Sequence, residues 1–149
     1  MRAVVQRIAG ARVEVGGEPV CQVGDGLLVY VGVERQDTPD DAGALARKVA
    51  NLRIFPDAAG KLNLNVLQAG GQALVVSAFT CQADARKGNR PSFERAAPTE
   101  QARQLYEQFV AELRQTGLAV HTGVFGEFMQ VRSTNDGPVV ILLDSKRTF

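Results

Sequence analysis

The hydrophobic positions of the chain fall into short runs rich in β-branched residues and two longer segments with helical spacing. The short runs favour strands, because branched side chains pack well on a pleated surface. These runs cover residues 3–8, 12–15, 27–33, 73–80, 118–124, 129–132 and 139–143. Gly16-Gly17 follows the second run, and paired glycines at that point indicate a tight turn with local antiparallel pairing.

Two segments repeat their apolar residues at spacings of three and four, as an amphipathic helix does. The first follows Thr38 as N-cap, with Pro39 at the first helical position and Asp41 near the positive end of the helix dipole. The second begins at Thr99 and stops at Gly117, a residue type favoured just after a helix C-terminus. The apolar residues are Ala42, Leu45, Ala46, Val49 and Leu52 in the first segment, and Ala102, Leu105, Tyr106, Phe109, Val110 and Leu113 in the second.

The order of these elements is not a strict β-α-β alternation. We therefore predict a mixed α/β domain of the α+β kind, with a largely antiparallel, barrel-like sheet and two main amphipathic helices. The 149 residues, of which 45% are hydrophobic and 22% charged, are typical of one globular domain spanning residues 1–149. A chain of this length buries enough surface to fold without a disulfide or a structural metal.

Charge and cysteine content exclude several classes of function. Seventeen Lys and Arg residues against sixteen Asp and Glu give a net charge of +1, which argues against nonspecific binding of duplex nucleic acid. Any contact with nucleic acid is therefore expected to be local. Cys21 and Cys81 form no Cys-x-x-Cys pair, which excludes a disulfide scaffold and a four-cysteine zinc site. With no histidine cluster either, we predict neither a metal nor another cofactor.

The sequence also lacks the features of a secreted or membrane protein. No apolar run approaches the roughly 20 residues that a membrane helix needs. The apolar triplet after Arg2 is too short for the core of a signal peptide. We therefore expect a cytoplasmic location and no membrane partner.

A long segment, residues 81–98, separates the strand run 73–80 from the second helix. Loops of this length are usually functional or disordered. Its basic and aromatic residues are Arg86, Lys87, Arg90, Phe93 and Arg95. Such a loop either contacts a phosphate backbone and stacks on a base or is a solvated surface loop, and its composition leaves both interpretations open.

Candidate nucleophiles cluster where the run 73–80 ends, at Ser77, Thr80 and Cys81. Strand ends are common places for active sites, although such hydroxyls also serve simply to bond nearby backbone. A nucleophile–base pair needs an imidazole, and the chain has only His121. Strand alternation places His121 on the face opposite Val120, which favours an exposed or structurally paired histidine over a catalytic one.

A second polar stretch, residues 135–138, precedes the run 139–143. Taken alone, its Asn-Asp-Gly-Pro sequence is typical of an ordinary turn before a strand. A trans proline is the default there, because only about 5–6% of X-Pro bonds in folded proteins are cis.

Together the two stretches resemble the D-aminoacyl-tRNA deacylase family, whose motifs read roughly Ser-Gln-x-Thr-Leu and Asn-x-Gly-Pro-x-Thr. The first motif is here Ser77-Ala78-Phe79-Thr80-Cys81, and the second is Asn135-Asp136-Gly137-Pro138-Val139-Val140. The likeness covers nearly the whole chain, in blocks that follow one another in the same order. Further blocks are Val5-Gln6-Arg7, Gly26-Leu27-Leu28-Val29, Arg53-Ile54-Phe55, Lys61-Leu62-Asn63-Leu64-Asn65-Val66, Gln68-Ala69-Gly70-Gly71, Arg90-Pro91-Ser92-Phe93 and Met129-Gln130-Val131.

The resemblance implies a homodimer of barrel-like subunits that hydrolyses the ester between a D-amino acid and the 3′-terminal ribose of tRNA. The resemblance also implies activity on tRNA-Ala that has been mischarged with glycine. It also implies that Gly137-Pro138 is a cis dipeptide reaching from one subunit into the other's pocket, where its carbonyls exclude an L side chain. By the same resemblance Arg7 holds this dipeptide, and Phe125 and Met129 line the pocket for the terminal adenine.

The chemistry of an ester agrees with this reaction class but leaves the nucleophile open. An ester carbonyl under attack develops an oxyanion, to which backbone N–H groups around Phe79 and Thr80 can donate. Thr80 either attacks the carbonyl itself or positions the substrate. Because no base is adjacent in sequence, we favour attack by water, assisted by backbone donors and the substrate's own neighbouring hydroxyl.

Three positions depart from the family pattern: Ala78 replaces Gln, Cys81 replaces Leu and Val140 replaces Thr. Loss of the Gln amide removes hydrogen bonds worth about 1–3 kcal/mol if they are buried and paired. Two alternatives therefore stay open. One is a hydrolase with Cys81 as nucleophile and His121 as base, and the other is a noncatalytic relative that binds aminoacyl-tRNA ends without turnover.

Overall fold

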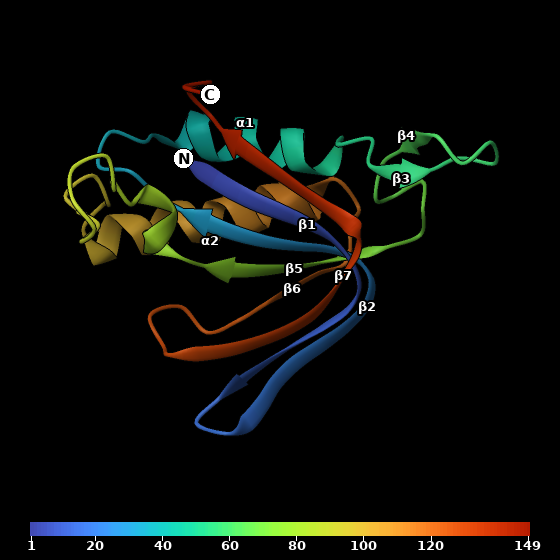
Figure 1. Cartoon of the computed structure of the whole chain (residues 1–149), viewed down its shortest axis with the longest axis horizontal. Coiled ribbons are helices and arrows are strands. Elements are labelled where there is room, and N and C mark those ends of the chain that lie inside the picture. The colour runs from blue at the N-terminus through green and yellow to red at the C-terminus, as the bar shows by residue number, and fades with distance from the viewer.

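The computed structural model describes all 149 residues and is built on a five-stranded sheet with the order β6-β5-β2-β1-β7 (Figure 1). β1 (Arg2–Val15) and β2 (Glu18–Gly32) form a long antiparallel hairpin. The predicted turn lies between them, and Gly16 and Gly17 both have positive φ angles there. β7 (Met129–Asp144) pairs antiparallel with the other edge of β1.

The remaining strands of this sheet run parallel to their neighbours. β5 (Gln72–Ser77) pairs with β2, and the short β6 (Val120–Thr122) pairs with β5. The prediction of a mixed α/β fold with a mostly antiparallel sheet is confirmed, because the two longest pairings are antiparallel. The prediction of a barrel is wrong for this chain: β6 and β7 are the two edges of the sheet and do not pair with each other. β6 has only three residues, all of them paired with β5, so it is too short to form a long pairing with β7 that would close the sheet.

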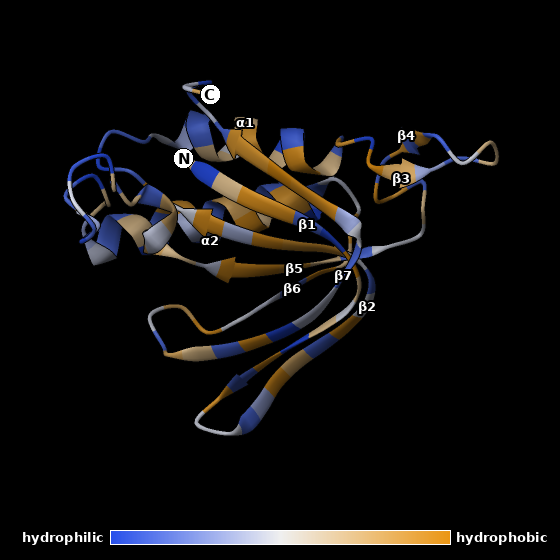
Figure 2. Ribbon diagram, in the orientation of Figure 1, coloured by the Kyte–Doolittle hydropathy of each residue, from blue (hydrophilic) through white to orange (hydrophobic).

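Both predicted helices are present and cover one face of the sheet (Figure 1). α1 (Pro39–Ala50) begins with a capping box between Thr38 and Asp41, and α2 (Thr99–Gln115) ends before Gly117, whose φ is 88°. Their apolar faces meet the strands in a core of 23 buried residues. Figure 2 shows the apolar ends of the strands at the level of the helices, and mixed polar and apolar residues along the hairpin that extends away from them.

Several predicted elements have different bounds in the structure. The runs 3–8 and 12–15 are one strand, as are 129–132 and 139–143, so residues 135–138 lie inside β7 and form no turn between strands. The run 73–80 ends as a strand at Ser77 and continues as a short 3₁₀ helix, η1 (Phe79–Gln82). Of the run 118–124 only the three residues of β6 pair. The sequence analysis missed the small hairpin of β3 (Phe55–Pro56) and β4 (Leu62–Leu64), whose strands are too short to show a period.

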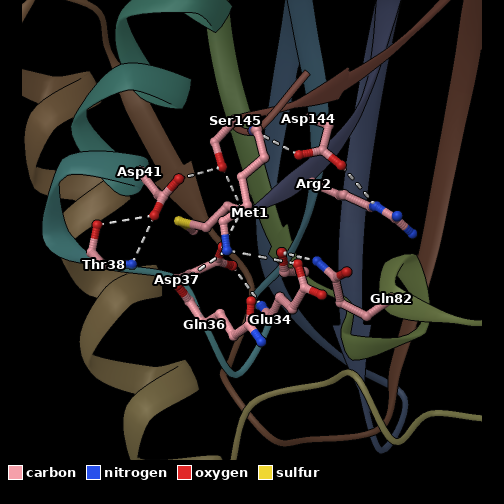
Figure 3. Close-up of polar contacts among 12 residues, drawn as sticks. Met1, Arg2, Glu34, Gln36, Asp37, Thr38, Asp41, Gln82, Asp144 and Ser145 are labelled. Carbon is pink, nitrogen blue, oxygen red and sulfur yellow. Dashed lines mark hydrogen bonds and ion pairs between the residues drawn. The ribbon is translucent and has the colours of Figure 1, made fainter. Parts of the chain in front are cut away.

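A buried polar network joins the start of β1 to the end of β7 (Figure 3). The α-ammonium of Met1 lies 2.6 Å from Asp37 Oδ1 and 2.6 Å from Ser145 Oγ, and the Ser145 hydroxyl donates to Asp41 Oδ1. Asp37 also accepts a bond from the backbone N–H of Glu34. These contacts hold the loop before α1 and the first turn of α1 against the start of β1 and the end of β7. No helix of the chain combines the length and apolar character needed to cross a membrane.

Candidate functional site

A cavity of about 650 Å³ opens where β5 ends. Its walls come from the sheet, from η1, from α2 and from the loop between β6 and β7, and they are mostly apolar. Six of the predicted site residues line it: Ser77, Ala78, Phe79, Thr80, Phe125 and Met129. Apolar cavities of this size with a few polar groups are typical of small-molecule sites.

The backbone at the end of β5 turns sharply and leaves donors free. The Ala78 N–H donates to the Val31 carbonyl at 2.8 Å, which is the last bond of the β5–β2 ladder. The first bond of η1 then runs from the Cys81 N–H to the Ala78 carbonyl. The N–H groups of Phe79 and Thr80 precede that bond, so they have no acceptor within η1, and neither is a donor in the hydrogen bonds that join turns, loops and side chains. Both residues are exposed and line the cavity, so these amides are available to an oxygen bound there.

A buried residue that no sequence pattern indicated holds η1 against the end of β2. The Gln82 side chain is fully buried, and its Nε2 donates to the Gly32 carbonyl at 2.8 Å. Gly32 leaves little room above it, since a Cβ at this position would lie 2.8 Å from Cys81 Cβ. A glutamine in an otherwise apolar turn is a weak sequence signal, because the same residue type is usually exposed.

The cavity contains no imidazole. His121 is exposed on β6, in register with Leu74, and does not line the cavity or form a hydrogen bond with Thr80 or Cys81. Cys81 is the third residue of η1 and is half-buried beside Gly32, and burial raises the pKa of its thiol despite the opposing charge of Arg2. A neutral, half-buried thiol without a base is a poor nucleophile. The geometry therefore disfavours the pair of Cys81 with His121.

Aromatic side chains form the wall opposite to the strand end. Phe125 packs against Tyr106 with ring centroids 5.6 Å apart, and the guanidinium of Arg103 lies 4.6 Å from the centre of the Phe125 ring. The Tyr106 hydroxyl donates to the Val75 carbonyl, and burial raises the pKa of this phenol. The Met129 side chain packs against Gly123, where an added Cβ would lie 2.5 Å from the Met129 sulfur. An aromatic face beside a thioether suits a nucleobase.

The other predicted site residues lie outside this cavity, on the β1–β7 side of the sheet. The Gly137-Pro138 bond is cis, as the resemblance implies and contrary to the default for proline. Both residues are exposed and neither lines the cavity of their own chain. Arg7 holds the segment: its Nε donates to the Asp136 carbonyl at 3.1 Å and its Nη1 to the Ile54 carbonyl at 2.7 Å. The structure thus divides the predicted site between two places.

Comparison with known proteins identifies the family. A family model described as D-Tyr-tRNA(Tyr) deacylase matches residues 4–144. The chain belongs to the D-aminoacyl-tRNA deacylase family. A D-aminoacyl-tRNA deacylase of Anaeromyxobacter dehalogenans is 59% identical over 149 residues, which are 100% of both chains. One of Symbiobacterium thermophilum is 54% identical over 100% of this chain and 99% of the relative.

Two solved structures have the same fold. A protein described as c-Myc DNA Unwinding Element Binding Protein superimposes with a TM-score of 0.91 and 43% identity, over 97% of this chain and 98% of the other. A probable eukaryotic D-amino acid tRNA deacylase gives a TM-score of 0.82 over 96% and 98% of the two chains. At 17% identity the latter shows the fold alone. The family model and the two relatives confirm the resemblance of the sequence to the deacylase family.

The deacylase motifs occupy the two places described above. The first covers the end of β5 and η1 beside the cavity, and the second lies within β7. Of the departures from the motifs, Ala78 lines the cavity, Cys81 lies in η1 beside Gly32, and Val140 is 47% exposed on β7. No group of three His, Cys, Asp or Glu side chains is placed to hold a metal ion.

Proposed function

We propose that the cavity at the end of β5 is the active site in which this deacylase hydrolyses D-aminoacyl-tRNA to a free D-amino acid and tRNA. The observation that supports this most directly is the pair of unbonded amides at Phe79 and Thr80 on the cavity wall. An ester carbonyl placed against them develops its negative charge beside two preorganised donors. The family membership supplies the substrate class.

The terminal adenosine fits the aromatic side of the cavity. In this arrangement the adenine lies against Phe125 and Met129, and the ester projects toward Thr80. Water attacks the carbonyl carbon, assisted by the neighbouring ribose hydroxyl, and the bond to the ribose oxygen breaks. The ribose oxygen takes a proton and the amino acid leaves with its carboxylate. Thr80 positions the ester, because its hydroxyl forms no hydrogen bond with a side chain that could remove the proton.

The proposal includes a second copy of the chain that supplies Gly137-Pro138 to this cavity. The dipeptide is exposed and lies outside the cavity of its own chain, so it is available to another molecule. Its carbonyls, placed against the substrate's amino group, leave room for a D side chain or for glycine and exclude an L side chain. Glycyl-tRNA is thus a second substrate of the same geometry.

An apolar surface supports the same assembly. Leu142, Val4 and Tyr30 lie side by side across three strands, on the face away from the helices, and Tyr30 lines the cavity. Leu142 is 59% exposed. Exposed apolar residues next to a site are typical of an interface. A second copy seated on this surface would bring its own β7 beside the cavity. Cytoplasmic tRNA is the partner that this homodimer would act on.

The test is release of amino acid from matched D- and L-aminoacyl-tRNA by the unmodified chain, Thr80→Ala and Pro138→Ala. We expect rapid release from the D ester only, a moderate loss in Thr80→Ala, and a loss of both rate and chiral selectivity in Pro138→Ala. Near-complete loss in Thr80→Ala would make Thr80 the nucleophile. Tight binding of aminoacyl-tRNA with no release from either enantiomer would instead support the noncatalytic relative.

Mixing two impaired variants tests whether the site is shared. Ala78→Trp fills the cavity, and Pro138→Ala removes the dipeptide from the opposite chain. A mixed dimer carries one intact cavity facing one intact dipeptide, so random mixing restores about a quarter of the sites. No recovery of activity after mixing, or a monomer by light scattering at micromolar concentration, would contradict the shared site.

A further inference from the structure

Two arginines, called the rim arginines below, have no acidic partner: one lines the cavity, and the other lies over an aromatic ring that lines it. Arg35 lies in the loop between β2 and α1 and lines the cavity, and its Nε donates to the Glu94 carbonyl at 2.7 Å. Arg103 lies on α2, over the ring of Phe125. Neither forms an ion pair with a carboxylate of the chain. Their positive charges are therefore available to a ligand.

Nearby cations differ in this respect. Arg95 forms an ion pair with Glu34, and Arg86 forms one with Asp84. These pairs involve two of the four cations in the loop 81–98; the other two, Lys87 and Arg90, form no ion pair but do not line the cavity. The unpaired cations in contact with the cavity or its lining are Arg35 and Arg103, neither of which the sequence pattern singled out.

The two arginines are attached to the same helix. The Gln101 side chain of α2 donates to the Arg35 carbonyl at 3.0 Å, and Arg103 follows two residues later. Thr99 and Ala102 of the same helix line the cavity. The start of α2 therefore carries Arg103 and holds the backbone of Arg35, while the Arg35 guanidinium is held by the Glu94 carbonyl.

We propose that Arg35 and Arg103 bind the phosphates of the single-stranded 3′ end of the RNA, next to the nucleoside held in the cavity. This inference rests on the proposed function. A cavity of about 650 Å³ holds one aminoacyl nucleoside, so the preceding nucleotides leave through the mouth and carry one phosphate each. A guanidinium matches a phosphate with two parallel hydrogen bonds. With a net charge of only +1, the chain attracts RNA through local cations of this kind.

The charges that line the cavity agree with a site that holds the nucleoside inside and binds the phosphates outside. Glu127, in the loop between β6 and β7, is its one carboxylate, and Arg35 is its one cation. The remaining lining is apolar or neutral, which suits an adenosine ester but offers no positive charge to a phosphate. Recognition of the backbone therefore depends on the rim.

The test compares two substrates that differ in their phosphates. One is D-aminoacyl-tRNA, and the other is the same D-amino acid esterified to adenosine alone. The variants are Arg35→Gln and Arg103→Gln, with Arg47→Gln as a control that removes the same charge from the exposed side of α1. We expect each rim variant to raise KM for the tRNA about three- to tenfold and to leave kcat unchanged. Each should also reduce the slope of log KM against log salt by about 0.7.

The adenosine ester and the Arg47→Gln control distinguish a phosphate contact at the rim from a change in the cavity or in net charge. Unchanged KM for the tRNA in both rim variants would overturn the inference, as would an equal change with the adenosine ester. An equal rise in KM from Arg47→Gln would overturn it too, because net charge alone would then be responsible. Binding of deacylated tRNA to the same variants, measured in parallel, tests the rim even if no ester is cleaved. Absence of hydrolysis by the unmodified chain would count against the proposed function and not against the rim.

Discussion

Arg7 and Asp136 form an ion pair in which Nε lies 3.0 Å from Oδ2. The same guanidinium reaches the carbonyls of Asp136 and Ile54, so one side chain ties the second motif to the segment before β3. The Arg7 side chain is only 11% exposed, whereas that of Asp136 is 56% exposed. A largely buried cation thus fixes the backbone immediately before the exposed Gly137-Pro138 dipeptide.

We expect Arg7→Gln to lower activity far more than stability. Loss of the three contacts releases the residues before the dipeptide, and a displacement of about 1 Å at a reacting centre can reduce the rate about 100-fold. The expected result is a roughly 10- to 100-fold lower kcat/KM on D-aminoacyl-tRNA. Arg12→Gln is the matched control, because Arg12 lies on the same strand and pairs with Glu14, but its side chain is 48% exposed. Equal kinetics of the two variants would contradict a role for Arg7 in holding the dipeptide.

Gly137 is the second residue on which the dipeptide depends. Its φ of 132° is one that residues with a side chain rarely adopt, and a Cβ there would lie 2.8 Å from Val139 Cγ2 and 3.1 Å from Arg7 Nη2. We expect Gly137→Ala to displace the dipeptide and reduce kcat/KM at least tenfold, with a loss of about 1–3 kcal/mol in the free energy of unfolding. Gly24→Ala is the control, since nothing lies within 4 Å of its added Cβ. Full activity of Gly137→Ala would show that the geometry of this segment is unimportant.

Cys81 provides a test of the remaining enzymatic alternative. Because burial raises the pKa of its thiol, little thiolate is present at neutral pH. We expect Cys81→Ser to keep kcat within about threefold of the unmodified chain, and iodoacetamide to leave the activity largely intact. A rate lowered by several orders of magnitude in the serine variant, at unchanged thermal stability, would make the thiol the nucleophile after all.

The parts of the site that sequence could predict are those carried by local pattern. The run 73–80 predicts a strand that stops in hydroxyl residues, and Ser77, Phe79 and Thr80 do line the cavity, although the strand itself ends earlier than predicted, at Ser77. The continuity of β7 through Gly137-Pro138 is obscured by residues that locally favour a turn. β7 pairs with β1 on both sides of this segment, while residues 136–139 have no partner in that register.

Other features depend on contacts between distant segments. The sheet would close into a barrel only if its two edge strands paired with each other. The hydrophobic pattern of a single run does not show which other strand it pairs with. The buried bond of Gln82 to Gly32 joins residues 50 positions apart, and the unpaired charge of Arg103 is visible only once its neighbours are known. Periodicity describes one face of one element, so such long-range partners stay outside its reach.

The carboxylate of Asp144 gives the fold a dependence on pH (Figure 3). Burial alone would raise its pKa, but bonds from Thr148, the Lys146 backbone and Arg2 together lower the pKa below its ordinary value. A carboxyl group with a lowered folded-state pKa stabilises the fold above the unfolded-state pKa of about 3.9. That stabilisation is lost as the pH falls through the folded-state pKa.

We therefore expect Asp144→Asn to be less stable than the unmodified chain at pH 7, by a difference that shrinks as the pH falls below about 4. Arg2 keeps a half-buried guanidinium without its carboxylate in this variant, which adds to the loss at neutral pH. Urea unfolding at a series of pH values measures the difference. Asp40→Asn, at an exposed position in the first turn of α1, is the control and should show a much smaller change. A difference for Asp144→Asn that stays constant from pH 7 to pH 3 would mean that its carboxylate does not stabilise the fold through its charge.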